Sequence, residues 1–114
     1  MAPHIDLAVL HNLFNGDRSR VREWLQLYLE EAPKMFEDLN SALLRDDADA
    51  LVRIAHELRP QAHYLGAGRM RDLLFTIGEC ARTEGARSCV HAVEELMALG
   101  AAVKDDVRSV LTMA

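Results

Sequence analysis

This sequence has little of what marks membrane spans, disulfide frameworks or β-sheets. Its apolar runs are a few residues long, far short of the roughly 20 residues that a bilayer span needs. Its two cysteines, Cys80 and Cys89, form no Cys-x-x-Cys pair, so we expect buried, reduced thiols rather than a disulfide, metal or redox site. β-branched residues are few and apolar residues recur every three or four positions. These features predict an all-α chain.

Positive charge is also scarce. Lysine and arginine number 13 against 18 aspartates and glutamates, which gives a net charge of −5. A nucleic-acid binder would need a basic face, so we expect protein partners and neither nucleic acid nor membrane. The first residues show no basic segment followed by an apolar run and a cleavage site, which predicts a cytoplasmic protein. We expect no metal, no cofactor and a monomer.

Five helical segments are predicted within a single domain, residues 1–114. The first is short, about 6–14, and ends at Asn15 and Gly16, which tolerate a left-handed backbone. The second is capped by Asp17 and runs to about Arg45, with Pro33 expected to kink or split it. The third segment begins after the aspartates at 46, 47 and 49. The fourth begins at about Arg69, and the fifth at about Arg87. Short turns between four long helices predict an antiparallel up-down four-helix bundle with a short additional N-terminal helix.

The apolar spacing also predicts which residues form the core. On the second segment these are Val21, Leu25, Tyr28, Ala32, Met35, Leu39 and Ala42. On the third they are Leu51, Ile54 or Ala55, Leu58, Ala62 and Leu65. On the fourth they are Met70, Leu73, Leu74, Ile77 and Ala81. On the last they are Cys89, Val93, Leu96, Gly100, Val103, Val107 and Val110. Trp24 and Tyr28 are expected to pack in the core and not to stack on a ligand, whereas His4, His11 and His91 are expected to be ordinary surface residues.

One stretch carries candidate chemistry, residues 55–67, AHELRPQAHYLGA. At 100° per residue, His56, Arg59, Pro60 and His63 fall on a side of the helix away from the apolar stripe. An exposed neutral imidazole can attack a phosphoryl group, and the charged product is stabilised by nearby cations. Arg53 and Arg59 lie one turn to either side of His56. Arg69 and Arg71 are further candidates if the bundle brings them close.

Nucleotide chemistry has no support in the sequence. It shows no phosphate-cradling glycine loop, no Walker lysine and no clustered carboxylates for magnesium. His56 would therefore receive and pass on a phosphoryl group with machinery supplied by a partner. We do not expect the chain to be a kinase.

The same stretch resembles the signature of histidine-containing phosphotransfer (HPt) domains of multistep phosphorelays. In that family the phosphorylated histidine is followed by leucine at two, lysine at three, commonly a small residue at four, and a hydrophobic-Gly-Ala group at nine to eleven. The matching positions here are His56, Leu58, Arg59, Pro60, Leu65, Gly66 and Ala67. Residues 15–43 and 68–85 are similar to the second and fourth helices of the family, so the resemblance covers nearly the whole chain.

Three positions depart from the family pattern. Arg59 replaces the usual lysine, which keeps the charge but presents a planar fork. Pro60 replaces a frequent glycine and frees the His56 carbonyl, because it has no amide to bond it. Gly78 stands where a glutamate is common, and we expect it to affect helix stability more than transfer.

The resemblance implies a function and a set of site residues. His56 would accept a phosphoryl group from a receiver aspartate, or from a hybrid kinase, and donate it to the aspartate of a response regulator. Arg59 and Arg53 would stabilise the phosphoryl charge, while Pro60, His63 and Gly66 would shape the docking surface. His63 is otherwise read as a solvated side chain, with a second acceptor or a phosphate donor as alternatives. Two rival functions stay open: a non-transferring adaptor that binds or sequesters a receiver domain, and a bundle enzyme with His56 as general base.

Overall fold

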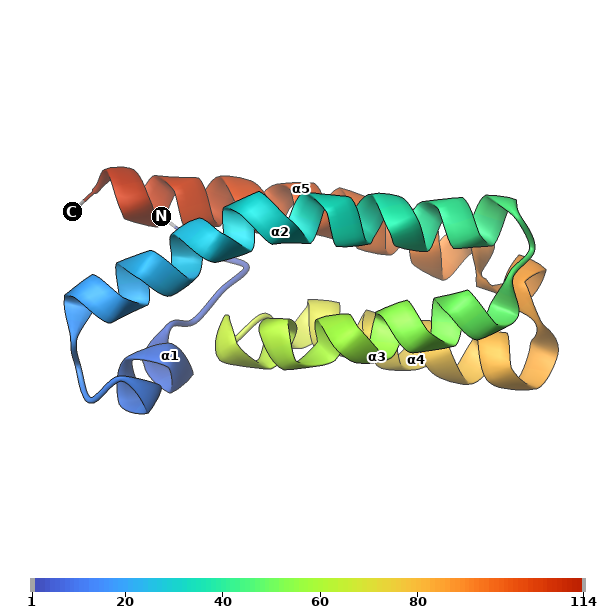
Figure 1. Cartoon of the computed structure of the whole chain (residues 1–114), viewed down its shortest axis with the longest axis horizontal. Helices are drawn as coiled ribbons and strands as arrows, with labels where there is room; N and C mark the ends of the chain where they lie inside the picture. Colours follow the sequence, from blue (N-terminus) through green and yellow to red (C-terminus); the bar gives the residue numbers. More distant parts are fainter. Residues whose placement is uncertain (1, 114) are drawn as a thin grey trace.

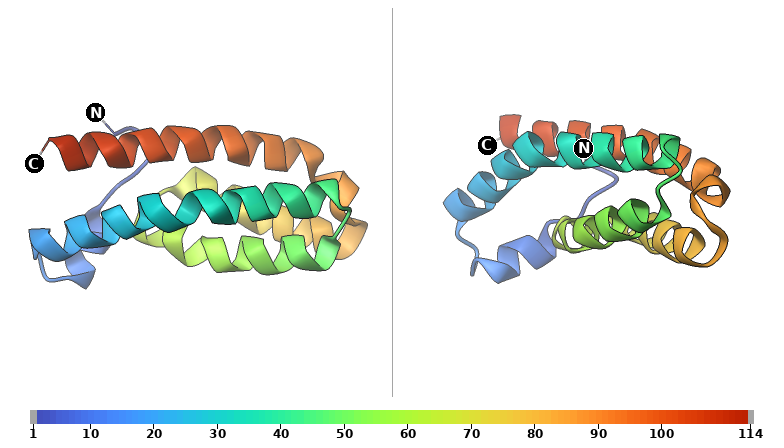
Figure 2. Two further views of the ribbon diagram at one scale, coloured as in Figure 1. Left: turned by 45° about the horizontal axis from the view of Figure 1, so that its top comes forward. Right: turned by 45° about the vertical axis from the view of Figure 1, so that its right-hand side comes forward.

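The computed structural model describes residues 2–113, which form an all-α bundle with no β-strand among them. Its helices are α1 (Ala8–Leu13), α2 (Arg18–Leu44), α3 (Ala48–Tyr64), α4 (Gly68–Glu84), the 3₁₀-helix η1 (Ala86–Cys89) and α5 (Val90–Thr112). Figures 1 and 2 show α2 and α5 side by side in one layer and α3 and α4 in the other. The predicted antiparallel four-helix bundle with a short N-terminal helix is confirmed.

Aspartate side chains start the second and third helices. Asp17 accepts hydrogen bonds from the backbone N–H groups of Ser19 and Arg20, at 3.0 and 3.3 Å. Asp47 accepts one from Ala50 N–H at 3.0 Å. Each carboxylate satisfies donors that the first helical turn leaves unpaired. Asp46 plays a different part, because it adopts a left-handed backbone (φ 57°) in the connection that precedes this cap.

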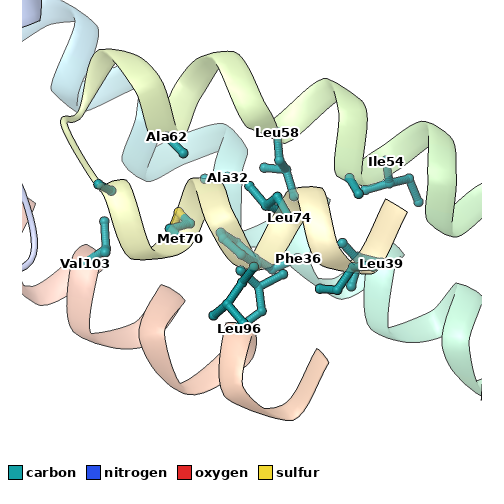
Figure 3. Close-up of a cluster of buried hydrophobic side chains, with 14 of the residues drawn as sticks. Ala32, Phe36, Leu39, Ile54, Leu58, Ala62, Met70, Leu74, Leu96 and Val103 are labelled. Atoms are coloured by element: carbon teal, nitrogen blue, oxygen red, sulfur yellow. The ribbon is translucent and has the colours of Figure 1, made fainter. Parts of the chain in front are cut away.

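The core lies between the two layers, where apolar side chains of all four long helices meet (Figure 3). All residues predicted for the inner faces of α3 and α4 are buried, including both Ile54 and Ala55. Trp24 stacks on Tyr28 with ring centroids 6.0 Å apart, as packing predicts. Cys89 is buried and Cys80 only partly so, and both thiols are free. No helix within residues 2–113 is long and apolar enough to cross a membrane.

Of the two outcomes predicted for Pro33, a kink or a split of the helix, the split does not occur, because α2 is continuous from Arg18 to Leu44. One core prediction for α2 is wrong. The buried residue after Ala32 is Phe36 and not Met35. A Cβ atom placed on Gly100 of α5 would lie 3.2 Å from the Phe36 ring, so the missing side chain there makes room for the aromatic ring. Met35 instead turns toward α3, where its sulfur accepts a hydrogen bond from Gln61.

The N-terminal segment is tied to the bundle by a contact that the sequence analysis missed. His4 was expected to be an ordinary surface residue. Its backbone N–H donates to Oδ2 of Asp106 at 2.8 Å, and its Nδ1 lies 3.0 Å from the same oxygen. Asp106 is the buried charged residue of α5, whereas Val110, predicted for the core, is only partly buried. Hydrogen bonding to His4 compensates the burial of this carboxylate.

Candidate functional site

His56 lies midway along α3, on the face turned away from the core. Leu51, Ile54, Ala55 and Leu58 of the same helix are buried, and this fixes the rotation of α3 about its axis. His56 is exposed, and its ring has no hydrogen-bond partner within residues 2–113. The side chain is thus presented by a rigid helix and is open to a partner molecule.

A small hollow of about 130 Å³ between α3 and α4 contains His56. Its lining residues are Val52, His56 and Arg59 from α3, and Leu74, Phe75, Gly78, Glu79 and Arg82 from α4. Sites for small molecules usually measure roughly 300–1,000 Å³. The hollow is therefore smaller than a usual small-molecule site and has room for a compact group beside His56.

Arg59 is held inside this hollow by an aromatic ring. Its guanidinium carbon lies 5.2 Å from the centroid of the Phe75 ring, which is the geometry of a cation–π contact. Arg59 is partly buried by this contact, whereas Phe75 keeps 49% of its surface exposed. The structure therefore places Arg59 beside His56, as the one-turn spacing predicts.

The α4 side of the hollow was missed by the sequence analysis. Arg82 brings a second guanidinium into it, paired with the carboxylate of Glu79 one turn earlier. Phe75, Gly78, Glu79 and Arg82 follow each other at steps of three, one and three on the helix that comes directly after the motif. That spacing marks one outer face of α4 and is the signal from which they are recognisable.

Arg53 is not part of this hollow. Its guanidinium lies 3.7 Å from the Glu57 carboxylate, and it lines a separate depression against α2, together with Met35 and Asp38. Arg69 is also elsewhere, because it pairs with Glu95 of α5. Of these candidate cations, Arg59 is the one that shares the hollow with His56.

Pro60 and His63 are exposed on the next turns of α3, outside the hollow. Helix α3 runs unbroken through Pro60 to Tyr64, so the missing amide leaves the His56 carbonyl without its usual helical partner. The His63 ring packs against the Tyr64 ring with centroids 5.6 Å apart. The two side chains thus form a continuation of the surface around His56.

Gly66 is required by the fold itself. It has a positive φ of 62°, and a Cβ atom there would lie 2.1 Å from the Asp6 carbonyl oxygen. The neighbouring Leu65 carbonyl accepts a hydrogen bond from Asp6 N–H at 2.8 Å. A glycine at this position therefore lets the N-terminal segment cross the α3–α4 turn.

A larger, mostly apolar groove of about 330 Å³ lies between α2 and α5. Tyr28, Pro33, Phe36 and Gly100 are among its lining residues. Tyr28 is buried, its hydroxyl has no hydrogen-bond partner among residues 2–113, and burial raises its pKa to about 12. Residues 2–113 contain no group of three or more histidine, cysteine, aspartate or glutamate side chains placed to hold a metal ion.

Comparisons with known proteins agree with this architecture. The family described as Hpt domain matches residues 23–111. The crystal structure of histidine-containing phosphotransfer protein B (HptB) from Pseudomonas aeruginosa PAO1 superposes with a TM-score of 0.88. The two sequences are 22% identical, and the match covers 100% of this chain and 99% of the other. Comparison with curated protein sequences gives no significant match.

Proposed function

Because this chain belongs to the Hpt domain family, we propose that it accepts a phosphoryl group on His56 from a receiver aspartate, or from a hybrid kinase, and passes it to the aspartate of a response regulator. Hpt domains serve histidine phosphotransfer in phosphorelays. The observation that carries the proposal is the exposed His56 in a small hollow that also holds Arg59. We further propose that residues 1–114 act as one domain and as a monomer.

The transfer is a substitution at phosphorus. The lone pair of the unprotonated ring nitrogen of His56 forms the N–P bond, and the P–O bond to the receiver aspartate breaks. The electron pair of that bond leaves with the aspartate carboxylate. The other ring nitrogen keeps its proton or releases it to water. Transfer onward to the next receiver reverses these bond changes, with that receiver's carboxylate as the nucleophile.

Arg59 supports the phosphoryl group during this exchange. Its guanidinium is positioned in the hollow and can donate hydrogen bonds to phosphoryl oxygens, which are strengthened by the opposite charges. Arg82 lies in the same hollow and adds positive potential when Glu79 releases it. Arg53 is proposed only as a longer-range charge, since it pairs with Glu57 on the α2 side.

The exposed surface beside the hollow is proposed to receive the partner. Pro60 and His63 extend the α3 face on which His56 lies. Gly66 contributes by holding the α3–α4 turn against the N-terminal segment. The receiver then supplies the remaining groups for chemistry, and we propose that this chain has no kinase activity of its own.

Transfer from a receiver domain carrying a ³²P-labelled aspartyl phosphate tests the proposal. Wild-type protein and a His56→Ala variant are mixed with the labelled receiver and magnesium, and the label on each protein is followed over time. The expected result is rapid label on the wild type and none on the variant. His91→Ala serves as the matched control, since it removes an exposed histidine of α5 that does not line the hollow and is expected to keep the label.

Equal labelling of the wild type and His56→Ala would contradict the proposal. A receiver that binds the wild type in calorimetry yet exchanges no phosphoryl group would establish the adaptor function instead.

A further inference from the structure

Phe75 is an exposed aromatic residue that the phosphotransfer motif does not include. It lies on α4, across the hollow from His56, and 49% of its surface is exposed. Apolar rings of this size are normally buried, because exposing them to water costs free energy. The Arg59 guanidinium carbon lies 5.2 Å from the centroid of this ring, so the ring is placed to orient the guanidinium.

Arg59 is held differently from Arg53, Arg69 and Arg82 on the same two helices. Arg53 pairs with Glu57, Arg82 with Glu79, and Arg69 with Glu95. A phosphoryl group would have to displace each of these carboxylates. Arg59 forms no ion pair with any carboxylate in residues 2–113, and the contact that restrains it is an uncharged π face. The ring orients the guanidinium without neutralising its charge, and leaves N–H donors at its edge available.

We propose that Phe75 is a positioning residue: stacked on Arg59 in the α3–α4 hollow, it holds the guanidinium beside His56 as an uncompensated, oriented cation for the phosphoryl group. The inference rests on the proposed function of His56. Phe75 then acts through Arg59 and does not itself contact the phosphoryl group. A contact of Phe75 with the receiver domain is the competing explanation.

A double-mutant cycle separates these two explanations. The variants are Phe75→Leu, which keeps an apolar side chain but removes the π face, Arg59→Gln, and the two combined. Transfer rates are measured in single turnover at saturating phosphorylated receiver. We expect Phe75→Leu to slow transfer about fivefold, the size of an exposed cation–π contact, and to have no further effect in the Arg59→Gln background. Phe75→Tyr retains the π face and should stay within about twofold of wild type.

Three results of the cycle would overturn the inference. One is a Phe75→Leu effect of equal size in both backgrounds, which would show direct contact with the receiver. Another is a Phe75→Leu variant that needs more receiver to reach its half-maximal rate but transfers at the wild-type rate when the receiver is saturating. The third is an unchanged rate in Phe75→Leu.

A spectroscopic readout on the unphosphorylated protein tests the contact itself. Protons of Arg59 that lie over the Phe75 ring should resonate upfield and move downfield in Phe75→Leu. Phe14→Leu is the matched control, because Arg20 lies over the Phe14 ring at 5.6 Å, outside the hollow. It should shift Arg20 protons only and leave transfer unchanged. Arg59 resonances that do not respond to Phe75→Leu would refute the stacking.

Failure of this inference and failure of the proposed function give different results. A wild-type protein that takes up no phosphate on His56 overturns the proposed function, whatever the Arg59 resonances show. A wild type that is labelled on His56, with a transfer rate that does not depend on Phe75, overturns only the role of Phe75.

Discussion

The two layers of the bundle carry hollows of opposite character. The hollow between α3 and α4 is small, about 130 Å³, and holds His56 with two arginines. The groove between α2 and α5 is larger, about 330 Å³, and mostly apolar. A larger apolar pocket is usually the first candidate for a binding site. We propose that the chemistry of this protein lies in the smaller one, because a phosphoryl group carried between proteins needs an exposed nucleophile and a cation, and no enclosing pocket.

We assign function to the α3–α4 face and stability to the α2–α5 face, and variants on each face test this assignment. The largest effect is expected for Arg59→Gln, which removes the guanidinium next to His56 without changing the apolar core. Loss of a charge-assisted hydrogen bond should slow transfer by about ten- to a hundredfold. Single-turnover transfer measures this, and thermal unfolding should change little. Arg53→Gln is the control on the other side of α3, with a much smaller loss expected; an equal loss would contradict the separation of the two arginines.

Gly100→Val should produce the opposite pattern. A Cβ atom on Gly100 would already lie 3.2 Å from the Phe36 ring, and a branched side chain would force the ring out of place. Overpacking of this kind costs about 1–3 kcal/mol in the free energy of unfolding. Urea denaturation measures the loss, while the transfer rate of the folded variant should stay unchanged. A slower transfer at full folding would show that the α2–α5 side also takes part in function.

Tyr28→Phe should make the protein more stable by about 1 kcal/mol, because it removes a buried hydroxyl that has no hydrogen-bond partner in the described part of the chain. The gain should grow at alkaline pH. Burial raises the Tyr28 pKa from 10.0 to about 12 in the folded protein, so between these values the unfolded chain ionises while the folded one does not. Below pH 10 this tyrosine adds no pH dependence, and as the pH rises toward 12 it favours unfolding.

Denaturation of wild type and Tyr28→Phe across this pH range measures the difference. A constant difference from pH 7 to pH 12 would contradict the pKa assigned to Tyr28.

Gly78→Ala should have the smallest effect. Gly78 lies within α4 and lines the hollow of His56, and a Cβ atom there meets no atom of residues 2–113 within 4 Å. Alanine should therefore raise the free energy of unfolding by about 0.5–1 kcal/mol through the lower entropy cost of the helix. Transfer should remain within about twofold of wild type. A large loss of transfer would show that the hollow needs the open space at this glycine.

The sequence predicted the fold better than the site. Helix number, the Asp17 cap and the buried faces of α3 and α4 follow from local chemistry and periodicity, which act within one segment. Phe36 was missed because its burial depends on Gly100, a residue 64 positions away in another helix. His4 was missed for the same reason, since its partner Asp106 lies on α5.

The same limit applies to the site. The sequence predicts that His56 and Arg59 lie together, because they are one turn apart on one helix, and the structure places both in one hollow. Arg53 has the same spacing to His56 but belongs to the α2 side, where it pairs with Glu57. Phe75 and Arg82 reach the hollow through the packing of α4 on α3, which spacing along the motif does not reveal.

The position of the phosphate after transfer tests the central claim most directly. Wild-type protein is incubated with a phosphorylated receiver, digested at alkaline pH and mapped by tandem mass spectrometry, with acid and base stability measured in parallel. The account predicts one acid-labile, base-stable phosphate on His56. Phosphate on His63 or on a serine, or none at all alongside tight receiver binding, would contradict it.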